Sequence, residues 1–543
     1  MAARLFGGIT EIDPPNPLNV NYVPEGIDDP RMVDKRFLFI NKYNRKVDGE
    51  YGDKFIPQPD YFRLVWDAWV DLGIMFSERY DMVKEDSPIV MEVAKNAILA
   101  YRDDSKKKLN LSGQSRTPTD IVITAMKCCV KLFGKINEDL ENGTMDFKLL
   151  NKLVRPFTEL VDTIMGHTWT CNSAVVSAML DVLAAVGKIL YSQLEERHHN
   201  LMVFLIQVAT ADSKEVTPQV KAKIGRCIGK YLEFDVYKSE HQFLVDVFDI
   251  CEQCVVNSEN AIKVSYAWTF AGWTDILKDE IPAFGENDFV IRILKTCRNM
   301  LAVPTKAKYN CGRACGNVFA WLKESHLEVP EIKVRVEELK DALVPLIGSG
   351  ADYKFRWNVV YAVGCIFENA IFFTKYGESM TVPIVEQLAL KLPVSQNFKE
   401  RSICLAALCK VSSKGMYGEQ YVGIWKKLLD CLGKPPVESS DSNNKFNIEC
   451  LKLFFHLVVM LETQDVNGIS DRLNSNVDYL REIIVSTTPS LLSEQMDKAV
   501  AAPDVLKTVK ERTRDRSDFE TVTLISDLVD MSLRISQGQR YDT

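Results

Sequence analysis

The sequence predicts an all-α protein built from helix pairs that repeat and stack along the chain. From Asp60 onward the apolar residues recur with helical periodicity, and no alternating run bounded by hairpin signals interrupts them. The stretch KFRWNVVYAVGCI, from Lys354, mixes aromatic, basic and small residues in a pattern that returns at regular distances. A small residue holds nearly the same place in each copy of this pattern, which is typical of helices that stack on one another.

Length and composition fit this fold class. The chain has 543 residues, of which 46% are hydrophobic and 26% are charged, so most of it can bury a core. The net charge of -8 argues against nucleic acid as a partner, because binding phosphates requires a basic surface. No run of 18 apolar residues and no apolar leader is seen, so we expect no membrane span and a cytoplasmic or nuclear location. The fourteen cysteines are then expected to be thiols.

Four segments are expected along the chain: an irregular arm over residues 1–56, divergent helical repeats over 57–165, HEAT-like repeats over 166–470 and a helical cap over 471–543. Prolines and glycines break any periodicity in the arm. Asp60 can cap the first helix, and Ser87-Pro88 opens the second with a cap followed by a proline. An amphipathic helix near Phe519 to Ile535 is a candidate to close the stack.

The length of the repeat follows from one small position in each copy, held in turn by Leu180, Gly229, Ala271, Gly316, Gly364 and Cys409. The successive separations are 49, 42, 45, 48 and 45 residues, a mean of about 46, where paired-helix HEAT and armadillo repeats have about 40 to 47. Each gap has room for a second helix, such as Val336 to Gly350 and the helix that starts at Val382. The prediction is therefore a HEAT/armadillo-like α-solenoid, and the alternative is an ordinary helical bundle with a coincidental spacing.

A glycine in the middle of a helix costs about 1 kcal/mol relative to alanine, so its recurrence needs a reason. In the stretch from Lys354, Trp357, Tyr361 and Gly364 share one helical face, and a second apolar face lies beside it. Such a helix is expected to pack on its partner and on the next repeat. We therefore expect Gly229, Gly316 and Gly364 where a neighbouring helix comes too close for a side chain.

Two of these stretches resemble a known family. KYNCGRACGNVFAWL, from Lys308, and FRWNVVYAVGCIF, from Phe355, are similar to successive helices of the HEAT repeat-containing protein 6 family. The resemblance extends from about residue 255 to 435, and the chain departs from the pattern at Ala271 and Cys409, where the family has glycine. It implies an armadillo-type α-solenoid with no catalytic activity, and it supplies no binding residues.

No catalytic or cofactor motif stands out in the sequence. A phosphate-binding loop, a nucleophile elbow and a His-Glu-x-x-His motif are all missing, so the sequence predicts no enzyme and no cofactor. Cys251 and Cys254 have the spacing of zinc ligands, but no second pair stands at the usual distance and a zinc site needs four ligands. A metal or enzymatic site in the arm or between repeats remains an alternative of a different class.

The function that a repeat array predicts is a scaffold or adaptor that binds partner proteins along its surface. The candidate contacts are basic residues at the starts of the repeated helices, namely Lys263, Lys308, Lys354, Arg356, Lys399 and Arg401. An acidic segment of a partner could dock on them. Alternatively these residues only solvate or cap the helix starts, or Arg356 and Arg401 form a structural ladder with neighbouring carboxylates. A nuclear-transport receptor is a narrower version of the same function.

Overall fold

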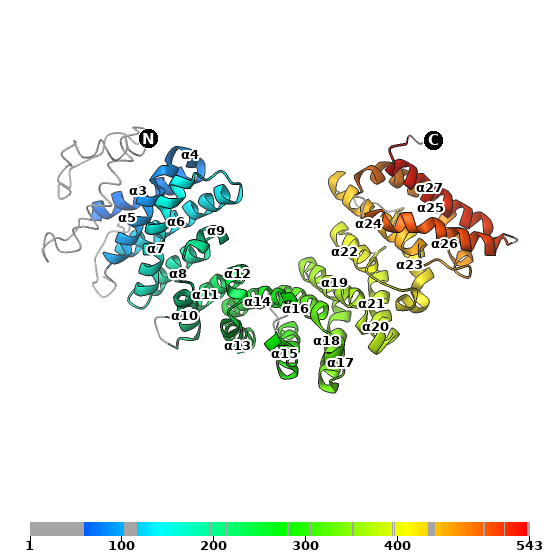
Figure 1. Cartoon of the computed structure of the whole chain (residues 1–543), viewed down its shortest axis with the longest axis horizontal. Helices are drawn as coiled ribbons and strands as arrows, with labels where there is room; N and C mark the ends of the chain where they lie inside the picture. The colour runs from blue at the N-terminus through cyan, green and yellow to red at the C-terminus, as the bar shows by residue number, and fades with distance from the viewer. Residues whose placement is uncertain are drawn as a thin grey trace. The chain divides into compact units, whose positions relative to one another are not determined.

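The computed structural model describes most of the chain (Figure 1). The described residues are 59–101, 117–194, 197–212, 216–257, 259–279, 282–303, 307–349, 352–393, 395, 397–432, 440–491, 495–514 and 516–539. The predicted arm, residues 1–56, lies outside them. Every regular element in the described part is an α-helix or a short 3-10 helix, which confirms the all-α prediction.

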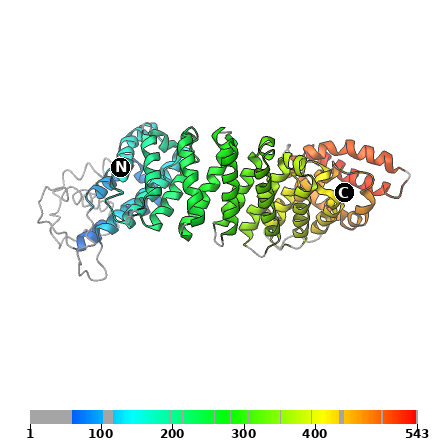
Figure 2. The same ribbon diagram turned by 90° about the horizontal axis from the view of Figure 1, so that it is seen from below.

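The chain divides into two compact units, Met1–Gly272 and Trp273–Thr543, and the division falls inside one helix of the predicted repeats, α14 (Asn260–Asp275). Within each unit the helices run side by side (Figure 2). In both units they form two layers. We call the layer that contains the helices with Gly229, Gly316 and Gly364 the first layer, and we call the other the second layer.

Unit 1 has a first layer of α3 (Pro59–Glu78), α6 (Pro118–Glu141), α8 (Ser173–Ala184), α11 (Pro218–Tyr231) and the start of α14. Its second layer consists of α5 (Ser87–Leu99), α7 (Phe147–His167), α10 (Arg197–Thr210) and α13 (His241–Asn257). Short connecting helices are α4 (Tyr80–Val83), η4 (Lys84–Asp86), α9 (Lys188–Tyr191), η5 (Ser192–Leu194) and α12 (Asp235–Lys238).

Unit 2 has a first layer of α16 (Lys308–Trp321), α19 (Tyr353–Glu368), α22 (Phe398–Leu408), α24 (Ser440–Val458) and α26 (Asp497–Thr513). Its second layer consists of α15 (Asn287–Ala302), α18 (Pro330–Gly348), α21 (Glu378–Lys391), α23 (Tyr421–Leu432), α25 (Val466–Thr487) and α27 (Phe519–Ser536). Short helices are η6 (Ile276–Asp279), η7 (Pro282–Gly285), α17 (Glu324–Leu327), α20 (Ile371–Tyr376), η8 (Lys414–Gln420) and η9 (Thr488–Ser490). Within this unit, α16, α19, α22 and α24 lie on the inner side of its curve (Figure 1).

Polar caps fix where several of the first-layer helices begin. Thr117 and Asp120 form a reciprocal capping box at α6, followed by proline at the first helical position. Asp352 accepts a hydrogen bond of 2.8 Å from the backbone N–H of Lys354 at the start of α19. The start predicted at Ser87-Pro88 is found there, but the cap position belongs to Asp86, because Ser87 is already helical and donates its hydroxyl to the carbonyl of Lys84.

The six small positions of the predicted repeat all belong to the first layer, in α8, α11, α14, α16, α19 and at the C-cap of α22. The intervening helices predicted over Val336 to Gly350 and from Val382 are α18 and α21 of the second layer. The structure thus confirms the helix-pair repeat and the assignment of the two helices in these repeats.

The surroundings of the repeated glycines are related but not identical. A Cβ atom on Gly229 would lie 2.5 Å from the ring of Trp268 in α14, and one on Gly316 would lie 2.5 Å from the ring of Tyr361 in α19. These distances confirm the close approach of the next first-layer helix. At Gly364 the prediction is wrong, because the nearest atom, on the side chain of Lys410, would be 3.4 Å away. The next helix passes Gly364 with small and flexible side chains, which leaves room for a methyl group.

All fourteen cysteines are free thiols, and all but Cys254 and Cys409 are buried. Burial raises the pKa of the Cys251 thiol well above its usual range, so this residue is a protonated core side chain of α13. Among the described residues, no three His, Cys, Asp or Glu side chains are grouped so that they could hold a metal ion.

No single helix in the described part of the chain has the length and apolar character to cross a membrane. One bent pair, Ser173–Ala184 with Lys188–Leu194, meets the criteria only when its two parts are combined, and these parts meet at 99°.

Candidate partner-binding surface

The first layer of unit 2 exposes one side that faces away from the second layer, and we call this side the inner surface of unit 2. Helix α19 presents two large aromatic side chains on it: Tyr353 is 37% exposed and Trp357 is 39% exposed. Residues 353, 357 and 361 follow at four-residue intervals and therefore lie on one helical face. The opposite face of α19 is buried in the core through Phe355 and Val359.

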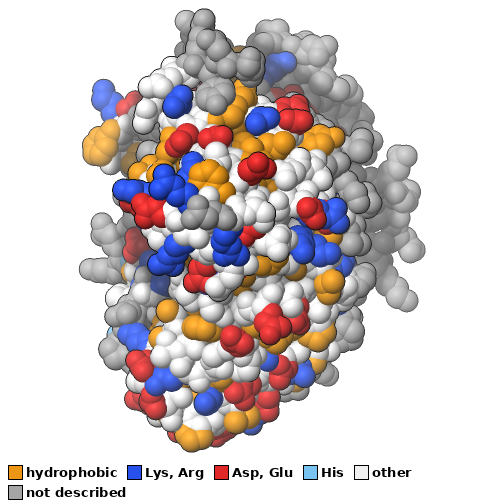
Figure 3. Space-filling model, turned by 90° about the vertical axis from the view of Figure 1, so that its right-hand side faces the viewer, with side chains coloured by type: hydrophobic (Ala, Val, Ile, Leu, Met, Phe, Trp, Pro, Cys, Tyr) orange, Lys and Arg blue, Asp and Glu red, His pale blue; other side chains and the backbone are white. Residues whose placement is uncertain are grey.

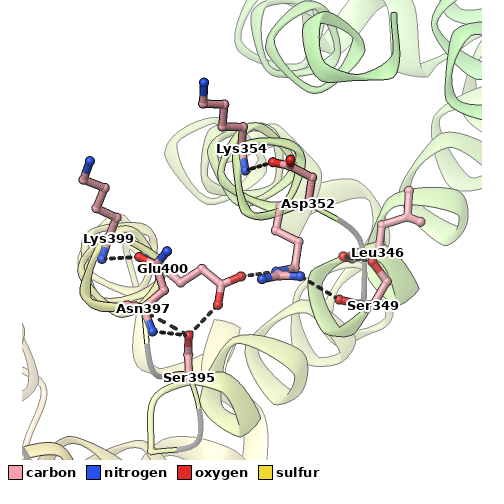
Figure 4. A network of polar contacts seen from close by, with 9 residues as sticks. Leu346, Ser349, Asp352, Lys354, Ser395, Asn397, Lys399 and Glu400 are labelled. Atoms are coloured by element: carbon pink, nitrogen blue, oxygen red, sulfur yellow. Dashed lines mark hydrogen bonds and ion pairs between the residues drawn. The ribbon is translucent and has the colours of Figure 1, made fainter. Parts of the chain in front are cut away.

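Four lysines recur at intervals of about one repeat in the first or second turn of neighbouring first-layer helices, and we call them the lysine row: Lys308, Lys354, Lys399 and Lys445. Lys354 and Lys399 are exposed and point to the same side, away from the second layer (Figure 4). Lys308 is half-buried, and its Nζ lies 4.9 Å from the centre of the Phe355 ring. Lys445, also exposed, was not among the predicted contacts, although it follows Lys399 by 46 residues, which is one repeat.

Arg356 lies on the other side of α19 from Lys354. Its guanidinium donates to the Glu400 carboxylate and, at 3.1 Å, to the carbonyl of Ser349 (Figure 4). The two charged side chains are only 16% and 8% exposed. Glu400 also accepts a hydrogen bond from the Ser395 hydroxyl, so the buried carboxylate has partners for both of its oxygens.

Arg401 is 4% exposed and its guanidinium lies over the ring of Phe446, 4.9 Å from the ring centre. Lys308 over Phe355, Arg356 with Glu400, and Arg401 over Phe446 thus join four consecutive first-layer helices by equivalent contacts. This arrangement favours the structural ladder for both arginines. Its rungs are not always carboxylates, since an aromatic ring takes the place of the acid at Phe355 and Phe446.

Lys263 belongs to the part of α14 that lies in unit 1, where it is half-buried in the first turns of the helix. The structure therefore brings Lys308, Lys354 and Lys399 together along one layer of unit 2 and turns Arg356 and Arg401 into the fold. A contact of any of these residues with a partner stays a prediction.

Unit 2 also has an open cleft of about 480 Å³, which the sequence did not predict. It is lined by Thr274, Asp275, Lys278, Asn317, Ala320, Trp321, Leu322, Lys323, Tyr361 and Asn369. Asn317 lies at its centre: the amide donates to Asp275 at 2.6 Å and to Thr274 at 3.0 Å, and the Tyr361 hydroxyl donates to the Asn317 carbonyl oxygen at 3.0 Å. Asp275, Asn317 and Tyr361 come from three different helices, α14, α16 and α19, so no local sequence motif indicates the cleft.

Asp275, Asn317 and Tyr361 of the cleft are linked in one hydrogen-bond network. The Asp275 carboxylate is held by Arg313 as well as by Asn317. Burial raises the pKa of the Tyr361 hydroxyl well above its usual range, so this group remains a hydrogen-bond donor. Such a network positions side chains and supplies polar contacts at the mouth of the cleft.

Elsewhere the surface charge is mixed. On the face drawn in Figure 3, Lys and Arg side chains are interspersed with Asp and Glu, and hydrophobic side chains lie scattered among them. Many exposed cations make ion pairs with a carboxylate, as Arg472 does with Asp430 at 3.3 Å. The lysine row differs from these surroundings because its members are not paired in this way in the described part of the chain.

Comparison with known proteins gives the fold but no closer relationship. No protein-family model matches the chain. An engineered protein has a similar structure, with a TM-score of 0.50 and 14% identity over 86% of this chain and 99% of its own. Kap121p bound to Pho4p has a TM-score of 0.47 and 12% identity over 94% of this chain, which spans 56% of that protein. A designed armadillo repeat protein has a TM-score of 0.33 and 15% identity over 46% of this chain and 98% of its own. With its repeated helix pairs in two layers, the chain has the fold of a HEAT/armadillo-like α-solenoid.

Proposed function

We propose that this chain is a non-enzymatic scaffold or adaptor that binds a partner protein on the inner surface of unit 2. The observation that carries the proposal is the exposed Trp357 beside the exposed Lys354 on α19. Tryptophan and tyrosine supply a large share of the binding energy at protein interfaces, and one turn of this helix offers both Tyr353 and Trp357.

The rigidity of the surface supports the same function. Helix α19 packs between α16 and α22, and its Phe355, Val359 and Ile366 are buried. The Arg356–Glu400 pair ties it to α22 from the opposite side. A surface held in place before binding loses little conformational entropy when a partner docks, so more of the contact energy appears as affinity.

The finer assignments are also proposals. Membership of the HEAT repeat-containing protein 6 family is supported by the two sequence stretches in α16 and α19, which are neighbouring first-layer helices. A role as a nuclear-transport receptor is a second candidate within the same class. Binding to the nucleotide-loaded transport GTPase would support that role, and its absence under conditions where the partner binds would exclude it.

An affinity capture with matched variants tests the main proposal. Trp357→Ala removes the exposed aromatic side chain of the inner surface, whereas Leu390→Ala removes an exposed side chain of α21 in the second layer. We expect a stoichiometric partner to be recovered with the wild type and with Leu390→Ala. Its affinity should fall by about 30-fold or more with Trp357→Ala, the size of an interface hot spot. Equal recovery by all three proteins would contradict the proposal.

Metal analysis tests the enzymatic alternative. Cys251 is buried and protonated in α13, and the only other cysteine near it in sequence is Cys254. We expect purified protein to contain no stoichiometric zinc. One zinc per chain, lost in Cys251→Ser, would replace the scaffold proposal with a metal site.

A further inference from the structure

We propose that the lysine row recognises an extended acidic segment whose carboxylates recur at every third residue. This inference rests on the proposed function, because it names the chemistry of the partner at the same surface. It draws on the spacing of the lysines, on their availability, and on the geometry of an extended chain.

The spacing of the row is set by the fold. Lys308, Lys354, Lys399 and Lys445 are separated by 46, 45 and 46 residues. The first three lie in the first turn of α16, α19 and α22, and Lys445 lies in the second turn of α24; these helices pack in that order. Three contacts hold these helix ends in register: Lys308 with Phe355, Arg356 with Glu400, and Arg401 with Phe446. Each contact joins one helix to the next at a separation of 44 to 47 residues. Packed helices lie about 8–10 Å apart, so the lysines recur at about this distance along the inner surface.

Three of the four lysines are available to a ligand, whereas Lys308 packs over Phe355. In the described part of unit 2, Lys354, Lys399 and Lys445 have no carboxylate within ion-pair distance. Two other lysines of the same repeats do pair with carboxylates: Lys410, just after α22, with Glu368 at 3.0 Å, and Lys452 in α24 with Glu449 at 2.8 Å. Because the whole chain carries a net charge of -8, an unpaired basic row is not a consequence of composition.

A ligand that binds several of these lysines must place its carboxylates at the same spacing as the lysines, about 8–10 Å. A polyproline II segment has three residues per turn and rises about 3.1 Å per residue, so every third side chain lies on one face, about 9.3 Å apart. A β-strand places every second side chain on one face, only about 6.8 Å apart. Carboxylates at positions i, i+3 and i+6 of a polyproline II segment therefore meet successive lysines, and Trp357 offers an apolar contact beside the Lys354 position.

Nucleic acid is the other polyanion that a basic row could attract. Its phosphates recur at every nucleotide and give a contact that depends on total charge and salt, without the three-residue register. The row of isolated charges thus fits a peptide with spaced carboxylates better than a continuous phosphate backbone.

Synthetic peptides test the register directly. Three labelled peptides with the same composition, rich in proline and with four glutamates, carry the glutamates at every second, every third or every fourth position. Fluorescence anisotropy with the full-length protein should show the tightest binding for the every-third peptide, by about threefold or more, because each isomer loses one or two ion pairs. Equal affinity for all three peptides, or tighter binding of a single-stranded oligonucleotide, would overturn the inference.

Charge reversal tests the site. Lys354→Glu with Lys399→Glu should weaken binding of the every-third peptide by about tenfold, since it replaces two attractions by two repulsions. The matched control is Lys426→Glu with Lys507→Glu, which makes the same change of charge at exposed positions of α23 and α26. An equal loss in the control would show a non-specific effect of net charge and would also overturn the inference. If none of the peptides binds but capture of the partner still depends on Trp357, the proposed function stands. Only the inference that the partner carries carboxylates at every third residue is then wrong.

Discussion

Gly312, Gly316 and Gly364 lie in the same stripe of small residues, yet the atoms around them differ. A Cβ on Gly312 would lie 2.6 Å from the backbone carbonyl carbon of Asn358, and one on Gly316 would lie 3.1 Å from the Cα of Ala362. At these two positions the backbone of α19 itself fills the space. At Gly364 the nearest atoms belong to the side chains of Lys410 and Ala407.

This difference predicts opposite effects of the same substitution. Gly312→Ala should lower the free energy of unfolding by about 1–3 kcal/mol, because backbone cannot move aside as a flexible side chain can. Gly364→Ala should raise it by about 0.5–1 kcal/mol, because alanine favours the helix and restricts the unfolded chain. Urea unfolding followed by circular dichroism measures both. A larger loss of unfolding free energy for Gly364→Ala than for Gly312→Ala would contradict the wider spacing between α19 and α22 at Gly364.

The Arg356–Glu400 pair predicts a strong non-additivity. Arg356→Met leaves the Glu400 carboxylate buried without its cation, which should cost about 3–5 kcal/mol. Replacing both residues with methionine removes both charges and should restore a large part of that loss. Urea unfolding of the two single variants and the double variant gives the coupling. Strictly additive losses would mean that the pair is solvated, contrary to its burial.

His456 predicts a pH-dependent stability. Burial, together with the neighbouring Lys498 ammonium that donates to its ring, lowers the pKa of His456 to about 3. The folded protein thus keeps this ring neutral, while the unfolded chain takes up a proton near pH 6.5. The stability is complete above that pH and declines as the pH falls toward 3, by about 2 kcal/mol at pH 5. Unfolding midpoints at pH 7.5 and pH 5 measure the effect, which should shrink in His456→Gln and persist in His241→Gln, a change at an exposed histidine.

Among the elements of the fold, the helices that carry recurring small residues were the easiest to predict from the sequence. The first-layer helices could be predicted because the close approach of the next helix forbids large side chains, as at Gly229 and Gly316, and small residues recur near this place in successive repeats. The second-layer helices then follow from the length of the gaps. Loops and short connectors such as α12 could not be predicted, because four residues carry no periodicity.

The basic helix starts could be found from the sequence, but the side on which each cation lies could not. Successive residues of a helix are turned by about 100°, so Lys354 and Arg356 point in nearly opposite directions although both belong to one basic start. The buried Phe355 does not settle which neighbour faces inward, because it lies between them in sequence. The cleft around Asn317 escaped prediction for a different reason, since it joins residues about 40 apart on separate helices.

Helix α27 is expected to cover the apolar sides of the two helices that precede it in unit 2. Helix α27 packs on α25 and α26 and buries Val522, Ile525, Leu528 and Val529. Ending the chain after Arg514 should uncover the apolar sides of α25 and α26, because a solenoid needs a covered end to stay soluble. We expect dye binding to exposed apolar surface and aggregation in size-exclusion chromatography. Ending the chain after Gln537, which keeps α27, should cause neither, and a monodisperse shorter variant would show that α27 is dispensable.

For the whole molecule, the repeat architecture implies that stability is local. Each helix of a layer contacts its neighbours, and rungs such as Arg356 with Glu400 join residues about one repeat apart. The free energy of a repeat array is therefore close to a sum over repeats and their interfaces. The division into two units at Gly272 agrees with this picture, because contacts concentrate within each unit.

Hydrogen exchange tests this locality with one variant in each unit. Gly229→Ala, whose Cβ would meet Trp268, should speed the exchange of amides in α8, α11 and the start of α14 of unit 1. Amides of α22, α24 and α25 in unit 2 should exchange as in the wild type. Arg356→Met should do the reverse, with faster exchange in α19 and α22. A uniform rise along the chain in either variant would mean that the two units unfold as one cooperative body, and nearest-neighbour contacts would then not account for the stability of the stack.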